Sequence, residues 1–416
     1  MKTLNKILAA TLLLLWASTA LPQKLSKKDL APMYSEYNFT TFEPVVYHVS
    51  DEVTRIYANI QLHHFQYAPD AEGRQEARFS IAFNLYSSYN DRAPLESRTE
   101  NYSDTLFAGQ EMQMAADLDV HAAYPGTYVL TMELTDLNKP ENKVMSVADI
   151  SKTSHFSSQN FYVEDEEGFP VFKSFIFQDQ YFRVRYNKPD TGSLQIRYYN
   201  REFPIAKPPF ALDKNMTFTL EPDSFYTVSL VGGVTDLLEL PWPGIYHIQA
   251  DPGHREGLTL YRFDEGFPDV NIPAMALAPL RYLTTEAEFK RLLSYQNYKV
   301  AVDSFWLERA SQNTERAKNM IKKFYQRVVD VNLLFSSYLE GWKTDRGLIY
   351  IIYGPPSEVY RRDGEEEWVY GERGNPMSIS FYFLKVENPF TDNDYSLQRS
   401  SIYQTSWYIA IENWRR

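Results

Sequence analysis

Alternation of apolar and polar residues with a period of two marks the first 165 residues. Apolar side chains take every second position in three clear stretches: Ile56, Ala58, Ile60 and Leu62; Ala77, Phe79, Ile81, Phe83 and Leu85; and Tyr128, Leu130, Met132 and Leu134. Such alternation predicts strands with one buried and one solvated face. Because turns rich in Gly, Pro, Asn and Asp separate the stretches, we expect an antiparallel β-sandwich at residues 21–165.

The same texture returns in residues 166–266, with the clearest strands expected at 182–186, 194–198 and 217–220. Gly232-Gly233 is typical of a hairpin turn. One sequence echo links the two blocks: Pro125-Gly126-Thr127-Tyr128 returns 118 residues later as Pro243-Gly244-Ile245-Tyr246. A Tyr placed there resembles the tyrosine corner of immunoglobulin-like sandwiches. We therefore expect two related immunoglobulin-like β-sandwiches.

Helical patterns enter only in residues 267–416. Thr285 and Glu288 form a capping-box pattern before a helix that we expect to reach about residue 295. Further helices are expected at 302–310 and 314–339, the second from an apolar stripe with helical spacing. Strands are expected at 348–353, 367–370, 378–386 and 401–411. The last domain is therefore predicted to be α+β, and the whole chain mostly β.

Residues 341–356, GWKTDRGLIYIIYGPP, carry the densest signals in the chain. Gly341 is expected to end the preceding helix, and Trp342 to be a large apolar anchor. Thr344 and Asp345 suit a turn, because their side-chain oxygens accept backbone donors. The following Ile- and Tyr-rich run predicts a buried strand, which the Gly-Pro-Pro sequence ends.

These residues resemble the GWxTD domain family. The resemblance rests on Asp303 to Trp306, the helix through Asn332, and a set of motif residues: Gly341, Trp342, Lys343, Thr344, Asp345, Arg346, Gly347, Tyr353, Gly354, Pro355, Pro356, Glu358 and Glu367, Trp368, Val369 and Tyr370. It implies an exported protein of Bacteroidota or related bacteria, with the domain placed after β-rich domains. It implies no settled biochemical activity.

The N-terminus has the pattern of a secretory signal peptide at residues 1–20. Lys2 and Lys6 precede an apolar core at residues 7–16, and small residues lead to a cleavage site near Ala20. No later run of about 18 apolar residues appears, so we expect no transmembrane segment. The expected location is the periplasm or the outer membrane.

Charge and cysteine content narrow the classes of partner. Without the leader the chain has 40 basic and 54 acidic residues, which disfavours nucleic acid and anionic lipid. The basic pair Arg361-Arg362 is expected on a solvated face. Because the chain has no cysteine, disulfides and thiol chemistry are excluded.

Catalytic patterns are scarce. All seven histidines lie at or before His254, so the predicted last domain lacks a Ser-His-Asp apparatus and most zinc sites. His63-His64 are expected to alternate across a strand. We expect no metal and no cofactor. Asp345 and Arg346 could form a catalytic or ligand-binding pair, but the simpler expectation is that Arg346 pairs with a carboxylate such as Asp345 or Glu358 for structure.

Acidic clusters at 365–367 and 392–394 could offer oxygens to calcium, but they lack the spacing of an EF-hand, and solvated turns are favoured. The aromatic stretch 401–414 is a candidate edge strand for a partner, with Trp407, Tyr408 and Trp414 as contacts. Thr105, in Asp104-Thr105-Leu106, matches a short sequence used for O-glycosylation in Bacteroidota.

These patterns favour an exported, non-catalytic protein of the cell envelope that acts as a protein-interaction or assembly module with other envelope proteins. Two alternatives stay open. A carbohydrate-active or peptide-cleaving hydrolase would need a pocket that gathers carboxylates, or Asp345 with Arg346. A glycan-binding sandwich would need exposed, coplanar aromatic rings on one sheet face.

Overall fold

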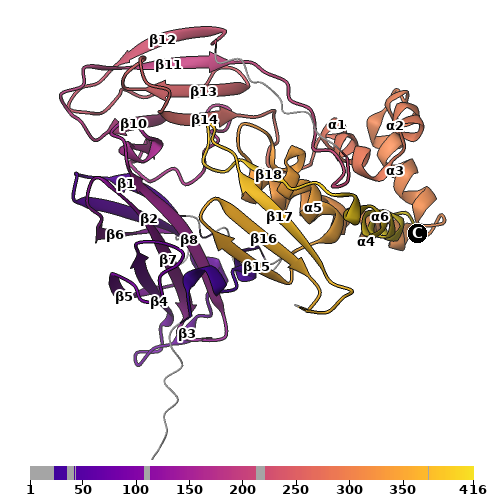
Figure 1. Ribbon diagram of the computed structural model, residues 1–416, viewed down its shortest axis with the longest axis horizontal. Coiled ribbons are helices and arrows are strands. Elements are labelled where there is room, and N and C mark those ends of the chain that lie inside the picture. The colour runs from indigo at the N-terminus through magenta and orange to yellow at the C-terminus, as the bar shows by residue number, and fades with distance from the viewer. Residues whose placement is uncertain (1–22, 35–41, 43, 107–112, 212–220, 373) are drawn as a thin grey trace, which may run out of the picture.

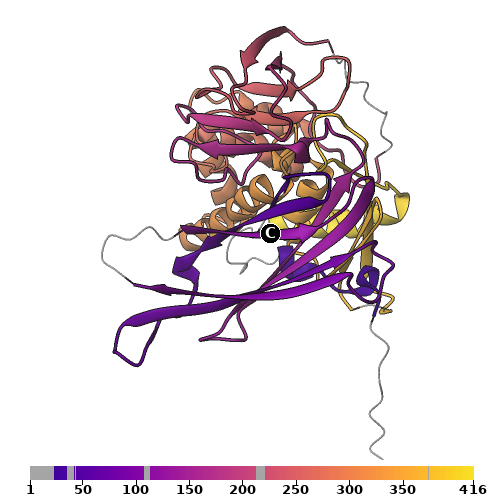
Figure 2. The ribbon, with the colours of Figure 1, turned by 90° about the vertical axis from the view of Figure 1, so that its left-hand side faces the viewer.

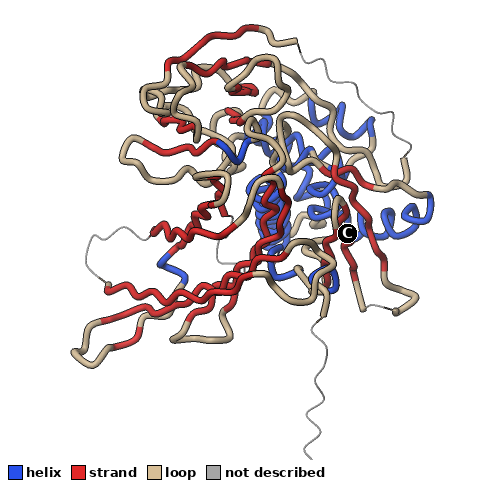
Figure 3. The backbone as a smooth tube through the Cα atoms, turned by 60° about the vertical axis from the view of Figure 1, so that its left-hand side comes forward, coloured by secondary structure: helices blue, strands red, loops and turns tan. Residues whose placement is uncertain are grey.

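The computed structural model describes the chain except for residues 1–22, 35–41, 43, 107–112, 212–220 and 373. Two β-rich parts come first in the chain, and a part that combines helices with a sheet comes last (Figure 1). Helices gather in the last part, while strands dominate the other two (Figure 3). This is the predicted mostly-β architecture with an α+β C-terminal region. The predicted leader and the expected strand at 217–220 lie outside the described residues.

The first part is a sandwich of two antiparallel sheets. One sheet has the order β1-β2-β6, and the other has β3-β4-β7-β8 with β5 paired to β4. The strands are β1 (Pro44–His48), β2 (Val53–Gln61), β3 (Ala68–Pro69), β4 (Gln75–Tyr86), β5 (Glu96–Thr105), β6 (Gln113–His121), β7 (Gly126–Asp136) and β8 (Lys143–Lys152). The alternating apolar residues of β2, β4 and β7 meet in one core between the sheets. Figure 2 shows these long strands running across the lower half of the view.

The second part packs a two-stranded sheet, β9 (Phe161–Asp165) with β10 (Phe182–Tyr186), against a four-stranded sheet of order β12-β11-β13-β14. The strands of the larger sheet are β11 (Ser193–Tyr199), β12 (Ser224–Ser229), β13 (Gly244–Gln249) and β14 (Leu258–Arg262). Both sheets contribute to one core. Gly232 and Gly233 have φ values of 60° and 81° and lie between the paired residues Val231 and Val234, so the hairpin-turn prediction is confirmed.

Both sandwiches contain the predicted tyrosine corner. The Tyr128 hydroxyl donates to the Ala123 carbonyl and accepts from the Ala123 amide, with both oxygen contacts at 3.1 Å. In the second sandwich the Tyr246 hydroxyl makes the same pair of bonds to Trp242, at 2.8 and 3.0 Å. The sequence echo is therefore a repeated local structure, in which one phenol ties the turn before a strand to the strand itself.

The last part packs helices against an antiparallel sheet around another hydrophobic core. Its helices are α1 (Pro273–Leu277), α2 (Glu286–Leu293), α3 (Tyr298–Arg309), α4 (Thr314–Phe335), α5 (Asp345–Tyr353) and α6 (Gln404–Arg415). Its antiparallel sheet has the order β15 (Glu358–Arg362), β16 (Glu365–Tyr370), β17 (Ile379–Lys385) and β18 (Tyr395–Leu397). Thr285 and Glu288 form the predicted capping box at the start of α2.

Two predicted strands are wrong. Residues 348–353 belong to helix α5, and residues 404–411 belong to helix α6. Every residue of α5 from Arg346 to Ile352 is buried, so this stretch has no solvent-exposed polar face to mark it as a helix. A short apolar run of this kind cannot be distinguished from a strand by pattern alone. In α6, the buried Trp407 and Trp414 are seven residues apart, which is two helical turns.

The three parts are joined by extensive contacts. The segment Leu25–Tyr34 precedes the first sandwich in the chain but packs on the C-terminal sheet: Leu30 donates its amide to the Val359 carbonyl at 2.8 Å. Tyr350 of α5 donates to the Tyr34 carbonyl at 2.9 Å. On the opposite side, the Phe390 loop packs against one face of the β11-β13-β14 sheet in a separate apolar cluster. The C-terminal part is thus held from two directions.

Candidate functional site

The motif begins with a glycine that the packing requires. Gly341 starts a short 3-10 helix, Gly341–Lys343, directly beneath the end of α4. A Cβ atom on Gly341 would lie 1.8 Å from the Val331 carbonyl oxygen, far inside contact distance. The Gly341 amide donates to the Ser336 hydroxyl at 2.9 Å. Helix α4 ends at Phe335. The prediction that Gly341 ends this helix is therefore wrong, and Gly341 instead packs against the side of the helix.

Trp342 lies buried, with 9% of its surface exposed. Its amide donates to the side-chain oxygen of Asn332 at 3.1 Å, and its carbonyl accepts from the Tyr282 hydroxyl at 2.9 Å. The Tyr282 ring meets the indole edge to face at 6.1 Å between centroids. Trp342 therefore connects α4 to the 3-10 helix Ala278–Leu283 and acts as an apolar anchor between them.

Thr344 and Gly347 set the start of helix α5. The Thr344 hydroxyl accepts from the Gly347 amide at 3.0 Å and donates to the Gly341 carbonyl at 2.8 Å. Thr344 is therefore the N-cap of a helix rather than a turn before a strand. A Cβ atom on Gly347 would lie 1.9 Å from the Gly341 carbonyl oxygen, so only glycine fits there.

Asp345 and Arg346 do not pair with each other: the carboxylate that Arg346 contacts is that of Glu366, not of Asp345 or Glu358. The Asp345 carboxylate receives both terminal nitrogens of Arg399, at 2.6 and 3.0 Å, and the Leu397 amide at 2.8 Å. This bidentate pair fastens the first turn of α5 to β18 and the segment after it. As neighbours on a helix, Asp345 and Arg346 project in directions about 100° apart and meet different partners.

Arg346 points into the protein, where 3% of its side chain is exposed. Its Nη1 lies 3.4 Å from the Glu366 carboxylate, and its Nη2 donates to the Asn393 carbonyl at 2.9 Å and to the Asn393 side-chain oxygen. The guanidinium lies over the rings of Tyr395 and Phe335, at 4.2 and 4.9 Å from their centroids. Arg suits this position better than Lys, because its planar guanidinium can stack on aromatic rings and donate several hydrogen bonds at the same time.

Glu366 is the centre of this network and is fully buried. It accepts from the Trp368 indole at 2.9 Å, and the Arg361 guanidinium lies 3.6 Å away. Burial alone would raise the pKa of Glu366, but Arg361 and Arg346 together with the hydrogen-bond donors hold it below its ordinary value. Burial and the neighbouring carboxylate raise the pKa of Tyr34, whose hydroxyl also contacts Glu366.

Sequence reasoning placed these residues wrongly. The 365–367 cluster is not a solvated turn but strand β16, in which Glu366 and Glu367 are buried. Arg361 is not on a solvated face but donates to the Tyr34 hydroxyl at 3.0 Å. The alternation of faces along β16 could have predicted that Glu366 is buried, because Glu366 lies two residues before the buried Trp368 and therefore on the same face.

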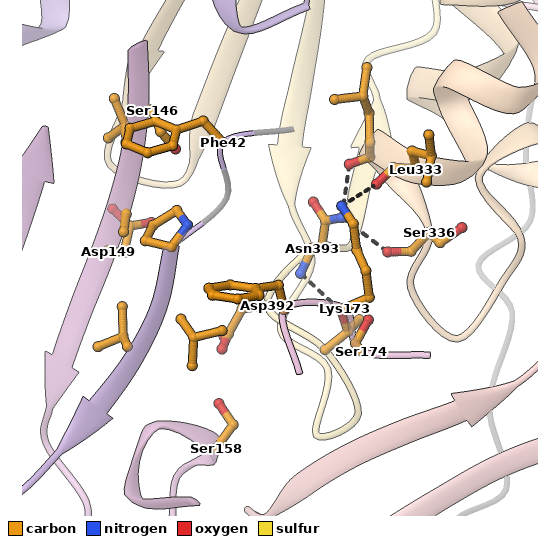
Figure 4. A pocket seen from close by; sticks show the side chains of 18 of the residues that line it. Phe42, Ser146, Asp149, Ser158, Lys173, Ser174, Leu333, Ser336, Asp392 and Asn393 are labelled. Atoms are coloured by element: carbon orange, nitrogen blue, oxygen red, sulfur yellow. Dashed lines mark hydrogen bonds between the residues drawn. The ribbon is translucent and has the colours of Figure 1, made fainter. Parts of the chain in front are cut away.

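A cavity of about 440 Å³ lies next to the Glu366 network, where the three parts of the molecule meet. Figure 4 shows Ser146 and Asp149 of β8 with Phe42 on one side, and Leu333, Ser336 and Asn393 of the last part on the other. The second part contributes the residues around Lys173. Arg346 and Arg361 also line the cavity, so the Glu366 network forms part of its wall.

Three polar side chains that line this cavity bond to other parts of the fold. Asn393 donates to the Ser336 carbonyl at 3.0 Å, Lys173 contacts the Leu333 carbonyl at 3.4 Å, and Asp149 accepts from Tyr89 at 2.7 Å. Chemically the arrangement holds together elements from distant parts of the chain. It offers no carboxylate paired with a nearby histidine, and the described residues contain no group of three or more His, Asp and Glu side chains that could hold a metal ion.

The other candidate residues lie elsewhere. Trp407 and Trp414 are buried in helix α6, and 53% of Tyr408 is exposed, so the three do not form an edge strand. His63 and His64 lie in the 3-10 helix Leu62–His64 with their rings 3.9 Å apart, rather than alternating across a strand. Thr105 is the last residue of β5.

The family model of the GWxTD domain matches residues 244–416, a range that contains the motif, the Arg346–Glu366 pair and Arg399, the partner of Asp345. The chain carries a GWxTD domain. The matched range starts at β13, before the expected boundary at 267, so the GWxTD domain match includes the last two strands of the second sandwich. His247 and His254 lie within it, and the expectation of a histidine-free domain is wrong.

Other comparisons add no function to the GWxTD domain. No curated protein matches the chain. Among solved structures, the crystal structure of red sea bream transglutaminase is similar at 9% identity and a TM-score of 0.19. The alignment covers 55% of this chain and 32% of the transglutaminase, or about a third of that protein's length. A likeness this weak carries no argument about fold or activity.

Proposed function

We propose that this protein is an exported, non-catalytic envelope protein in which the GWxTD domain acts as a platform for assembly with other envelope proteins. The observation that supports this most is the use of the motif. Its glycines lie where a Cβ atom would clash, and Thr344 caps a helix. Arg346 is held in a buried ion pair and Asp345 in a partly buried one. A catalytic pair would need at least one polar group that faces a substrate.

A scaffold of this kind also needs a surface for its partner, and strand β12 is the best candidate. It is the first strand in the order β12-β11-β13-β14, so one of its edges makes no ladder with another described strand. Phe225 on β12 is 64% exposed, and Trp242, in the loop before β13 of the same sheet, is 61% exposed. An extended segment of an envelope protein could add to such an edge through main-chain hydrogen bonds.

The leader pattern at residues 1–20 supports export, since it combines basic residues, an apolar core and small residues. Among the described residues, every helix is too short or too polar to cross a bilayer. Periplasmic or outer-membrane association is the location that fits the proposal.

A hydrolase is the second candidate, and one observation favours it. Burial raises the pKa of Asp394, a carboxyl group in the loop beside Arg346. A raised pKa is what a general acid requires. However, Asp394 already accepts from the side chain of Asn388 at 3.2 Å, which is also the pattern of a structural loop. The glycan-binding alternative has weaker support, because the stacked Tyr57 and Tyr162 rings, 4.7 Å apart, cover each other's faces.

The test is chemical crosslinking of the native protein in its own envelope, followed by identification of the captured proteins. We expect a stoichiometric set of envelope proteins, reduced by Phe225→Asp and unchanged by Leu95→Asp. Leu95 is 63% exposed in the first sandwich, so it controls for added charge on an exposed apolar position. Recovery of the protein alone, together with turnover of a glycan or peptide that Asp394→Asn abolishes, would favour the hydrolase.

A further inference from the structure

A second cavity, lined by residues that do not line the three-part junction, lies between helices α4 and α6. It is a groove of about 670 Å³, and we call it the α4–α6 groove. Its apolar lining comes from Met320 of α4, Ile352 of α5, and Ala410 and Trp414 of α6. The Trp414 indole donates to the Ile352 carbonyl at 3.0 Å, which fixes the ring in place. The groove therefore has a firm apolar surface large enough for a small molecule.

Cations surround this apolar surface. Arg316, Lys323 and Arg327 line the groove from α4, and Arg416 lines it from the end of α6. Arg316 and Lys323 are seven residues apart, so they lie on one side of the helix, two turns from each other. The one acidic side chain in the lining, Glu315, is bonded to Lys318 at 2.9 Å.

Surface lysines of the neighbouring helices α2 and α3 are held in ion pairs. Lys290 pairs with Glu286 at 2.6 Å, and Lys299 pairs with Asp303 at 2.7 Å. Within the described residues, the side chains of Arg316 and Lys323 make no ion pair and no hydrogen bond. In a chain with a net charge of −12, two uncompensated cations beside an apolar floor are unusual, and they raise the local potential.

We propose that the α4–α6 groove binds an amphiphilic anion, a molecule with a phosphate or carboxylate group joined to an apolar body. Arg316 and Lys323 bind the anionic group, and Met320 and Trp414 contact the apolar body. The first turn of the 22-residue helix α4 lies at the same end as Arg316 and adds a favourable dipole. The groove shares Ile352 and Tyr353 with the end of α5, but the Arg346–Glu366 network and β12 do not line it, so it does not depend on the assembly role.

The test is isothermal titration of the full-length protein with three probes: monomeric dodecyl phosphate, inorganic phosphate and dodecyl maltoside. We expect dodecyl phosphate to bind. Inorganic phosphate, which lacks the apolar tail, and dodecyl maltoside, whose head group is neutral, should each bind at least about tenfold more weakly. Binding should weaken with added salt, because exposed charges are screened. Equal binding of inorganic phosphate and dodecyl phosphate would overturn the role of the apolar floor.

Variants locate the binding. Lys323→Gln and Arg316→Gln should each weaken dodecyl phosphate binding about three- to tenfold, as expected for loss of a partly solvated charge contact. Lys322→Gln is the matched control, since Lys322 is the neighbouring exposed lysine and does not line the groove. If Lys322→Gln has the same effect as Lys323→Gln, the contact is general charge attraction and the proposal fails.

Two further outcomes would overturn the proposal. Binding to vesicles of anionic lipid without binding of monomeric dodecyl phosphate would make the groove part of a membrane contact. Tighter binding of a polyglutamate peptide than of dodecyl phosphate, lost in Lys323→Gln, would make it a site for an acidic protein segment. Unchanged circular dichroism of the variants ensures that a loss of binding is not a loss of fold.

Discussion

The guanidinium of Arg346 lies 3.4 Å from the carboxylate of Glu366, and the two side chains are 3% and 0% exposed. Arg346 directly follows the Gly-Trp-Lys-Thr-Asp motif, and Glu366 lies on β16, so the pair joins helix α5 to the sheet. Its neighbours Arg361 and Tyr34 extend the network to β15 and to the N-terminal segment. The motif region thus holds together elements from both ends of the chain.

Replacing Arg346 should destabilise the protein strongly. Arg346→Met leaves the Glu366 charge buried with fewer partners, and removing one partner of a buried ion pair costs about 3–5 kcal/mol. Equilibrium urea unfolding measures this change. Lys290→Met is the control, because Lys290 and Glu286 are more than 70% exposed and such a pair contributes at most about 1 kcal/mol. Similar losses for both variants would contradict a structural role of Arg346.

Gly341→Ala should also destabilise, because the added Cβ would lie 1.8 Å from the Val331 carbonyl oxygen. We expect a loss of about 2–4 kcal/mol, in the range of severe overpacking. Gly192→Ala provides the matched control, since an added Cβ there meets no atom within 4 Å. The melting temperatures of the two variants measure the difference, and an unperturbed Gly341→Ala would show that α4 and the motif pack less closely than described.

The tyrosine corners should contribute similarly in the two sandwiches. Tyr128→Phe removes the bonds to Ala123, and Tyr246→Phe removes those to Trp242. Each loss should cost about 1–3 kcal/mol, as for a half-buried backbone group that loses its partner. Tyr408→Phe is the control, because Tyr408 is 53% exposed. A neutral result at only one corner would mean that the repeated sequence does not have a repeated role.

Buried histidine should make stability depend on pH. Burial lowers the pKa of His247 to about 4, and this ring bonds to the Thr259 hydroxyl at 2.9 Å and to the Arg255 carbonyl at 3.0 Å. The unfolded chain keeps the ordinary value of 6.5 and takes up a proton first as the pH falls. The stabilisation is therefore complete above about pH 6.5 and is lost progressively down to pH 4.

His48 has the same lowered pKa of about 4 and the same kind of contact, to Thr54 at 3.0 Å. His247→Gln should thus remove part of the pH dependence of the free energy of unfolding between pH 6.5 and 4, and the double variant with His48→Gln should remove more. Urea unfolding at several pH values measures it. His254→Gln, at an exposed position, is the control for the substitution itself. An unchanged slope in the double variant would rule out these histidines as its source.

Much of the fold could be predicted from the sequence, because its strands are half-exposed. Alternation in β2, β4 and β7 follows directly from one wet face, and the Tyr128 and Tyr246 turns have distinctive residues. The prediction for helix α5 was wrong for the opposite reason. This helix is buried on all sides, so its Ile- and Tyr-rich sequence has no exposed polar face to distinguish it from a strand. The informative signal was the N-cap Thr344.

The candidate site was less predictable, because its contacts span long distances in the chain. Nothing local to Asp345 identifies Arg399 as its partner, and nothing near Glu366 indicates Arg346 or Tyr34. Partner choice in an ion pair depends on the packing of whole elements. Sequence reasoning found that the motif matters for structure but assigned its charges to neighbours.

The central claim is that the charged residues of the motif serve the fold. A double-mutant cycle on Asp345 and Arg399, whose side chains are 11% and 9% exposed, tests it most directly. Urea unfolding of Asp345→Asn, Arg399→Met and the double variant should give a coupling free energy of about 1–3 kcal/mol. A coupling near zero would contradict the account, and would mean that Asp345 is held for a purpose other than stability.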